Sequence, residues 1–226
     1  MKKQVFNPYL PENEYVPDGE PHLFEGRVYI YGSHDRAFGS KYYEEHYVTW
    51  SVPENDLSDW KYEGVIYKRT QDPSNPDDEF QLWAPDVTKG PDGRYYLYYC
   101  LSFQPVIGVA VSDSPAGPFE FYGHVKYPAH INNGAKLQEF MPFDPAVLTD
   151  EDERVYLYYG FAPACERKMT FPNPDEMDIP EEEKIILREK FKAIESVKFG
   201  ENGMCVELES DMITVKAVPH AYKLLH

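Results

Sequence analysis

The sequence has few cysteines, few basic residues and no long hydrophobic run, and each shortage excludes a class of protein. Its 226 residues include 3 cysteines, which are too few and too far apart for a disulfide framework, and no C-x-x-C pair for zinc. The 22 lysines and arginines face 39 aspartates and glutamates, so the net charge of −17 argues against nucleic acid and anionic membrane surfaces as partners. No segment approaches the ~18 apolar residues of a membrane-spanning helix.

The N-terminus also lacks the apolar stretch of a secretory signal. Residues 1–8 carry two lysines but no hydrophobic segment, so we predict no signal peptide and expect a cytoplasmic location. Neutral, sugar-like or other small-molecule partners are compatible with the acidic charge.

Aromatic residues, prolines and glycines are abundant instead. The chain contains 19 tyrosines, 13 phenylalanines and 3 tryptophans, together with 20 prolines and 14 glycines. Aromatic residues favour strands, whereas proline and glycine favour turns. This composition is typical of an all-β protein with many short strands.

One strand pattern recurs three times. Residues 26–32, 93–99 and 153–160 each place an arginine after a turn and continue with alternating aromatic and aliphatic residues, at intervals of roughly 60 residues. A further pair of short strands follows each copy. Four strands in such a unit are the pattern of a β-propeller blade. The alternative is a β-sandwich whose strands resemble one another by chance.

We therefore predict a single, incomplete β-propeller domain over residues 1–226. The expected boundaries are about 15–70 for blade one, 80–127 for blade two and 140–218 for blade three, with residues 212–216 as the last strand. An insertion at about 161–203 interrupts blade three. There a capping-box pattern, Asp178-x-x-Glu181, and a run of glutamates predict one helix near residues 179–195.

Each unit opens with a short strand that carries an aspartate, namely Asp18, Asp86 and Asp144. The first strand of a propeller blade lines the central channel, so we expect the three carboxyls to gather at one end of it. Like charges held close together raise one another's pKa, which is how a site keeps one carboxyl as a base and another as an acid. The alternative is that these aspartates only cap turns at strand ends.

Aromatic side chains are expected beside these carboxyls. Trp83 would offer a flat apolar surface to the C–H face of a sugar, although propeller cores also use tryptophan. Phe143, which precedes Asp144, would form the facing wall. We place Asp86 and His34 with them among the substrate-binding residues. The histidines show no metal-ligand spacing, so we predict neither a metal nor another cofactor.

Several motifs together resemble glycoside hydrolase family 43. They are NPYL at 7–10, VPDGEPH at 16–22, VYIYGSHD at 28–35, WAPDV at 83–87 and FDPAV at 143–147. They occur in the family's order, and the similarity is strong over roughly residues 7–160 and moderate over 204–218.

The resemblance implies a five-bladed β-propeller and an inverting hydrolase for arabinose- or xylose-containing plant polysaccharides, of the α-L-arabinofuranosidase or β-xylosidase type. It assigns the general base to Asp18, the pKa-modulating and orienting aspartate to Asp144, and a wall of the sugar subsite to Trp83. In an inverting mechanism the base deprotonates the attacking water, and a carboxylic acid roughly 6.5–9.5 Å away protonates the departing oxygen.

The sequence departs from the family after its third unit. The family's general acid is a glutamate in a fourth blade, and none of Glu201, Glu207 and Glu209 matches its motif. Either the chain is a truncated product or another chain supplies the rest, and its uncovered blade faces predict a homo-oligomer or a complementing chain. The alternative to a hydrolase is a non-catalytic carbohydrate-binding or interaction module.

Overall fold

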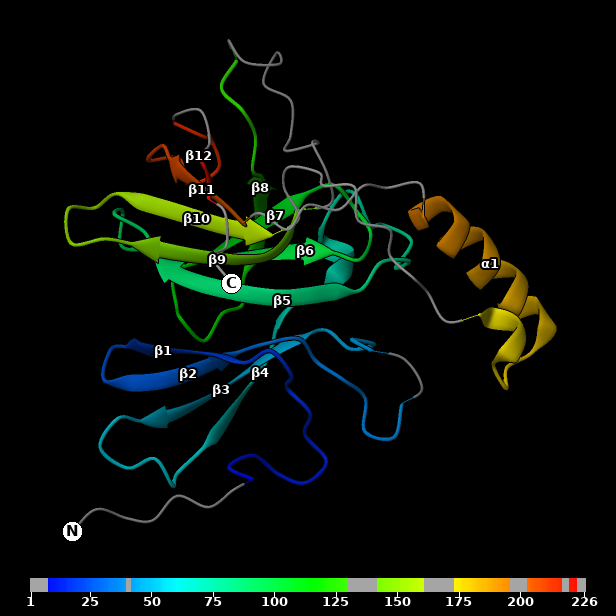
Figure 1. Ribbon diagram of the computed structural model, residues 1–226. Coiled ribbons are helices and arrows are strands. Elements are labelled where there is room, and N and C mark those ends of the chain that lie inside the picture. Colours follow the sequence, from blue (N-terminus) through cyan, green and yellow to red (C-terminus); the bar gives the residue numbers. More distant parts are fainter. Residues whose placement is uncertain are drawn as a thin grey trace.

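The fold consists of strands in three separate antiparallel sheets. The computed structural model describes residues 8–39, 42–129, 142–160, 173–195, 203–216 and 220–222. Within these residues each sheet has four strands, and the single α-helix, α1 (Glu181–Glu195), stands to one side of the sheets (Figure 1). The predicted all-β class with one helical insertion is confirmed.

The sheets follow one another along the chain, and each is built from consecutive strands. The first blade contains β1 (Glu20–Phe24), β2 (Arg27–Tyr31), β3 (Tyr47–Pro53) and β4 (Lys61–Tyr67). The second contains β5 (Leu82–Lys89), β6 (Tyr95–Leu101), β7 (Ile107–Ser112) and β8 (Glu120–His124). The third contains β9 (Phe143–Thr149), β10 (Val155–Gly160), β11 (Gly203–Leu208) and β12 (His220–Tyr222). The described residues also form the short 3-10 helices η1 (Arg69–Gln71) and η3 (Pro174–Glu176).

Strand β6 is buried on both faces, which makes the second blade the middle layer. Tyr95, Leu97 and Tyr99 belong to the core shared with the first blade, whereas Tyr96 and Tyr98 belong to the core shared with the third. This division follows from the two-residue period of a strand, which sends successive side chains to opposite faces. The tyrosine-rich repeat therefore fills two cores at once.

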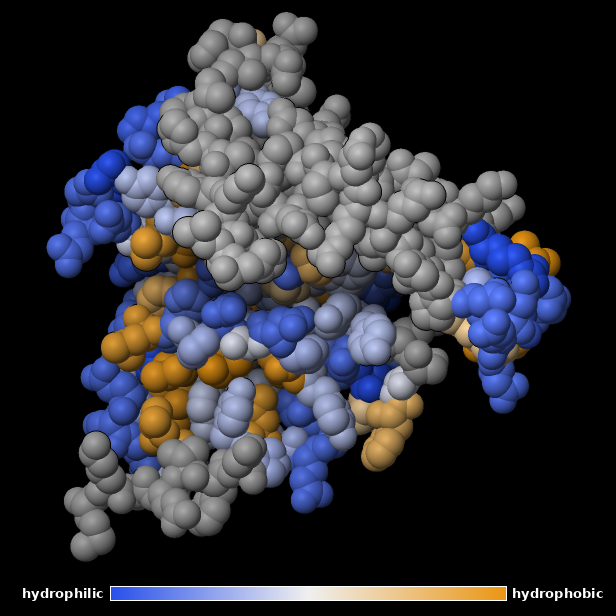
Figure 2. Space-filling model, in the orientation of Figure 1, coloured by the Kyte–Doolittle hydropathy of each residue, from blue (hydrophilic) through white to orange (hydrophobic). Residues whose placement is uncertain are grey.

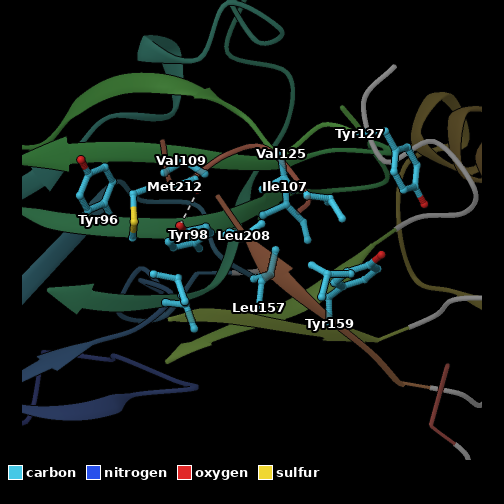
Figure 3. Close-up of a cluster of buried hydrophobic side chains, with 14 residues drawn as sticks. Tyr96, Tyr98, Ile107, Val109, Val125, Tyr127, Leu157, Tyr159, Leu208 and Met212 are labelled. Carbon is cyan, nitrogen blue, oxygen red and sulfur yellow. Dashed lines mark hydrogen bonds between the residues drawn. The ribbon is translucent and has the colours of Figure 1, made fainter. Parts of the chain in front are cut away.

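Figure 3 shows the core between the second and third blades. Ile107 and Val109 from β7 meet Leu157 and Tyr159 from β10, and all four are buried. The Tyr98 hydroxyl donates a 2.7 Å hydrogen bond to the carbonyl oxygen of Met212. A buried phenol needs such a partner, so this bond lets an aromatic residue lie inside the core without leaving a polar group unpaired.

A buried polar network joins the first two blades. The Tyr99 hydroxyl lies 2.7 Å from the Tyr67 hydroxyl and donates to Asp72 Oδ2 at 2.7 Å. Asp72 is fully buried, and His124 Nε2 lies 2.9 Å from the same oxygen. Burial opposes ionisation of Asp72, but hydrogen bonds from His124, Tyr99 and the Ser74 amide outweigh it and lower its pKa.

The first strands of the three blades lie next to one another. Strand β5 contacts both β1 and β9, and the Thr149 amide donates to Thr88 Oγ1 at 3.2 Å across the second and third blades (Figure 1). Neighbouring four-stranded sheets whose first strands meet in this way are successive blades of a β-propeller. The structure thus has the predicted architecture of about three blades.

The third blade differs from the expectation at its last strand. Residues 212–216 form only isolated bridges, to Leu208 and to Lys126 of the second blade, and β12 takes the edge position instead. The segment lies between the end of β11 and Lys126. The Lys126 amide donates to the Ile213 carbonyl and the Lys126 carbonyl accepts from the Val215 amide, both at 2.9 Å, while the Lys216 amide donates to the Glu207 carbonyl at 2.8 Å. The insertion limits at residues 161 and 203 border segments 161–172 and 196–202, which lie outside the described residues.

Helix α1 begins with three glutamates, which suit the positive end of the helix dipole. Hydrophilic side chains cover most of it in the view of Figure 2, in agreement with a predominantly solvated surface. Among the described helices, none is long and apolar enough to cross a membrane.

Candidate functional site

Asp18 and Asp144 occupy the same position in two blades. In each of these blades, the fourth residue after the recurring arginine pairs with a residue of the neighbouring strand, Tyr31 with Glu20 and Tyr158 with Ala146. The aspartate lies two residues before that partner in both blades. Both aspartates have left-handed backbones, with φ of 54° and 46°. This conformation is uncommon for residues other than glycine, so the two blades share a specific local geometry.

The equivalent residue of the second blade is Ala84, not Asp86. Asp86 pairs with Tyr98, as Glu20 pairs with Tyr31, and Ala84 lies two residues earlier with φ of 28°. The prediction that Asp86 forms the third member of the carboxylate cluster is therefore wrong. The second blade contributes a methyl group at this position, which leaves two carboxyls at the site rather than three.

Loop lengths account for only part of the misplacement of Asp86. In the first blade two residues, Glu25 and Gly26, join the first two strands, and both have positive φ. The matching hairpins in the other blades use three-residue loops at 91–93 and 151–153. The equivalent position therefore lies nine residues before the arginine in the first blade and ten residues before it in the other two. Asp86 lies eight residues before the arginine of its blade, which is two positions too near although the second and third blades have hairpins of equal length.

Asp86 instead connects blades from inside the structure. It is 5% exposed, and its Oδ1 lies 2.6 Å from His22 Nε2 of the first blade. Its Oδ2 accepts a 2.6 Å hydrogen bond from the Val147 amide of the third blade. With both oxygens committed to protein partners and almost no exposed surface, Asp86 is not placed to contact a substrate.

The charge of Asp18 affects the titration of Asp144. Burial, followed by the negative charge of Asp18, raises the pKa of Asp144 from 3.8 to about 6. Solvent still reaches both side chains, so Asp144 is only partly desolvated. A negative charge that perturbs Asp144 must lie at the same end of the molecule, and the predicted convergence of Asp18 and Asp144 agrees with this geometry. A carboxyl that titrates near pH 6 is suited to proton chemistry close to neutrality.

Asp18 is held by side chains from the loop that follows β2. Ser33 is fully buried, and its hydroxyl lies 3.4 Å from Asp18 Oδ2 while it accepts a 2.8 Å hydrogen bond from the Ala84 amide. Asp18 is also close enough to Tyr43 for its charge and hydrogen bonding, after burial, to raise the pKa of the Tyr43 phenol. Ser33 thus links the carboxylate of the first blade to the backbone of the second.

Trp83 lies at the centre of an aromatic cluster beside these carboxyls. The centroid of its ring lies 5.4 Å from that of Phe143, 5.1 Å from that of Phe103 and 6.1 Å from that of Tyr43. The corresponding angles between the ring planes are 83°, 77° and 64°. Edge-to-face contacts of this kind fix the indole. The structure therefore brings Trp83 and Phe143 together, as predicted, with Asp144 next to Phe143 in β9.

The backbone beneath Trp83 is also fixed. Its carbonyl oxygen accepts a 2.8 Å hydrogen bond from the fully buried Tyr47 hydroxyl, and Cys100 Sγ lies 3.7 Å from the same oxygen. Burial is the main reason that the Cys100 pKa rises to about 12, so this thiol stays protonated.

Both ring nitrogens of His34 contact other protein atoms. Its Nδ1 lies 3.0 Å from the His46 carbonyl oxygen and its Nε2 lies 2.9 Å from Glu14 Oε1. Its side chain is 16% exposed. The expected substrate contact is therefore not supported, because both ring nitrogens already bind the protein. His34 positions the loop that follows β2.

Sequence reasoning missed Ser33, Tyr43 and Phe103. Tyr43 and Phe103 lie in loops that do not repeat between blades, so the periodicity gave no signal for them. Ser33 lies in the family-like motif at 28–35, directly after β2, and its proximity to Asp18 could have been inferred from the pairing of β1 with β2. Within the described ranges, no cluster of three or more histidine, cysteine, aspartate or glutamate side chains could hold a metal ion.

Comparison with known proteins identifies the family. The model of glycosyl hydrolases family 43 matches residues 16–198, so the chain belongs to this family. It is 55% identical over 192 residues to a xylosidase/arabinosidase of Thermoclostridium stercorarium, covering 83% of this chain and 40% of that protein. It is 35% identical over 165 residues to xylosidase/arabinosidase 43A of Humicola insolens, covering 67% of this chain and 45% of that protein.

Solved structures show the same fold. A family 43 β-xylosidase/α-arabinofuranosidase from a compost metagenome, solved with xylotriose, superposes with a TM-score of 0.62 over 96% of this chain and 62% of that one, at 24% identity. An α-L-arabinofuranosidase from Clostridium thermocellum gives 0.55 over 91% and 55%, at 23% identity. The chain thus has part of the five-bladed propeller of the family, and it spans less than half the length of the two curated relatives named above.

Proposed function

We propose that this chain carries the general-base side of the active site of an inverting glycosidase. Asp18 acts as the base, and Asp144 orients it and tunes its charge. The proposal rests chiefly on one observation, the placement of these two carboxyls at the same left-handed position of two blades with coupled charges. Clustering two acids costs stability, so a fold retains such a pair chiefly for function.

In this mechanism Asp18 removes a proton from a water molecule. The water oxygen attacks the anomeric carbon, the bond to the departing oxygen breaks, and that oxygen takes a proton from the general acid. The family resemblance places the acid in a fourth blade, beyond the three present here. Ser33, whose hydroxyl lies 3.4 Å from Asp18 Oδ2, keeps the carboxylate oriented during the proton transfer.

We propose a pentose-containing glycan as the substrate. Both curated relatives described above are named xylosidase/arabinosidase, which supports arabinose or xylose as the sugar. Trp83, fixed by Phe143 and Phe103, offers an apolar surface on which a sugar ring can pack.

The test is hydrolysis of aryl α-L-arabinofuranosides and β-D-xylosides by the protein that contains this chain. Asp18→Asn is expected to reduce kcat by about 10²–10⁴-fold, the range that general acid–base catalysis supplies. Asp113→Asn, which alters an exposed aspartate of the second blade, is the matched control and should keep full activity. Unchanged turnover by Asp18→Asn would refute the assignment, and sugar binding without turnover in the parent protein would favour the non-catalytic binding module.

We further propose that a second copy of this chain covers the face of the third blade that carries Leu148 and Tyr158. Leu148 is 51% exposed and Tyr158 44% exposed on that face. Covering one such half-exposed side chain contributes about 1 kcal/mol, roughly half of what full burial contributes. Light scattering at micromolar concentration should therefore give an oligomeric mass that Leu148→Lys reduces, and a monomer in both cases would contradict the proposal.

A further inference from the structure

Tyr43 connects the two halves of the candidate site and has no assigned role. It lies in the loop between β2 and β3 with a left-handed backbone, φ 58°, and its amide donates a 2.5 Å hydrogen bond to Asp35 Oδ1. Asp35 is itself paired with Tyr15 through an isolated bridge. The loop therefore holds the Tyr43 backbone in an unusual conformation, and this conformation determines the direction of its side chain.

The side chain of Tyr43 meets one residue from each half of the site. Its ring packs against Trp83 of the second blade, with centroids 6.1 Å apart and planes at 64°. Its phenol lies near enough to Asp18 of the first blade for the charge and hydrogen bonding of that carboxyl to raise the phenol's pKa. The neighbouring Tyr42 differs, because it is 78% exposed and its ring contacts Tyr43 and not the residues of the site.

We propose that Tyr43 is a positioning residue that holds the Asp18 carboxylate in register with the sugar-binding surface of Trp83. This inference rests on the proposed function, in which Asp18 is the base and Trp83 binds the sugar. A base must lie within hydrogen-bond reach of the water it deprotonates, and small displacements of such a group reduce the rate strongly. Tyr43 fixes this geometry across the boundary between two blades.

The phenol is suited to donating a hydrogen bond and not to transferring a proton. Burial raises the pKa of Tyr43 to about 12, followed by the charge and hydrogen bond of Asp18 and by the charges of Asp35 and Asp144. Efficient acid catalysis needs a pKa near the working pH. Tyr43 therefore stays protonated and remains a donor to Asp18 over the whole range in which carboxyls titrate.

Kinetics of Tyr43→Phe test this role in the protein that contains this chain. The substitution keeps the ring that packs on Trp83 and removes only the hydroxyl. We expect kcat on an aryl pentoside to fall about 10-fold with KM changed less than twofold, because substrate binding is retained while the base loses its orientation. Tyr42→Phe is the matched control. A Tyr43→Phe enzyme with the kcat of Tyr42→Phe would overturn the proposal.

A second measurement needs neither turnover nor a Tyr43 variant. In the chain labelled with ¹³Cζ-tyrosine, a pKa of about 12 leaves roughly a tenth of Tyr43 ionised at pH 11. Asp18→Asn should increase that fraction severalfold, whereas Asp113→Asn should not, with amide spectra confirming that each protein is folded. An unchanged fraction in Asp18→Asn would refute the contact, whereas full turnover by Asp18→Asn would refute only the proposed function.

Discussion

Removal of the Asp18 charge should lower the pKa of Asp144 without restoring its ordinary value. Asp144 rises from 3.8 to about 6, with burial as the larger cause and the charge of Asp18 as the smaller. The smaller of two causes accounts for less than half of a shift of roughly two pH units. Asp18→Asn should therefore lower the pKa of Asp144 by up to about one unit and leave it between about 5 and about 6.

Carboxyl ¹³C NMR of the chain labelled at aspartate measures this value directly. Asp113→Asn is the control, because it changes the net charge equally at an exposed position. Two results would refute the reasoning. An Asp144 pKa that does not move would show that the two carboxyls do not face each other, and a fall to 3.8 would show that burial is not the main cause.

Three further substitutions probe stability and the geometry of the blades. Folding raises the pKa of Asp144, so the stabilisation from its protonated form is lost as the pH rises from about 4 through about 6. Asparagine cannot ionise, so Asp144→Asn should stabilise the fold by ~1 kcal/mol at pH 7, after allowance for solvent screening. The same substitution should not stabilise the fold at pH 3. Urea unfolding at the two pH values measures this, and a gain at pH 3 would contradict it. Asp72→Ala should cost about 3–5 kcal/mol in urea unfolding at pH 7, because it leaves buried donors without their acceptor, and a loss below 1 kcal/mol would show the network to be dispensable. Ala84→Asp should raise the pKa of Asp144 further, since it adds a third carboxyl at the equivalent position, and an unchanged value in the NMR titration would contradict the equivalence.

The repeat in the sequence was sufficient to predict the blades. Alternating tyrosines in a strand that is buried on both faces, as in β6, give a periodic signal that directly reflects the packing of three layers. The pairing of Asp18 with Asp144 followed from the same repeat. Asp86 was misassigned because a distance of eight to ten residues from the recurring arginine does not distinguish it from Ala84, which lies ten residues before Arg94 as Asp144 lies ten residues before Arg154.

Residues outside the repeat could not be found in this way. Tyr43 reaches Asp18 from a loop whose conformation depends on the Asp35 hydrogen bond, a contact eight positions along the chain with no periodic pattern. The diversion of residues 212–216 towards Lys126 depends on backbone hydrogen bonds between two blades. Such contacts are decided by tertiary packing, and local propensity does not report them.

We propose that Asp18 and Asp144 share one end of a propeller channel beside Trp83 and that a pentose binds there. A crystal structure of the chain with a xylo-oligosaccharide or arabino-oligosaccharide is the decisive measurement. We expect a sugar ring packed on the Trp83 indole, with its anomeric carbon facing the water held by Asp18. A sugar bound elsewhere on the molecule, with the two carboxyls on separate surfaces, would contradict it.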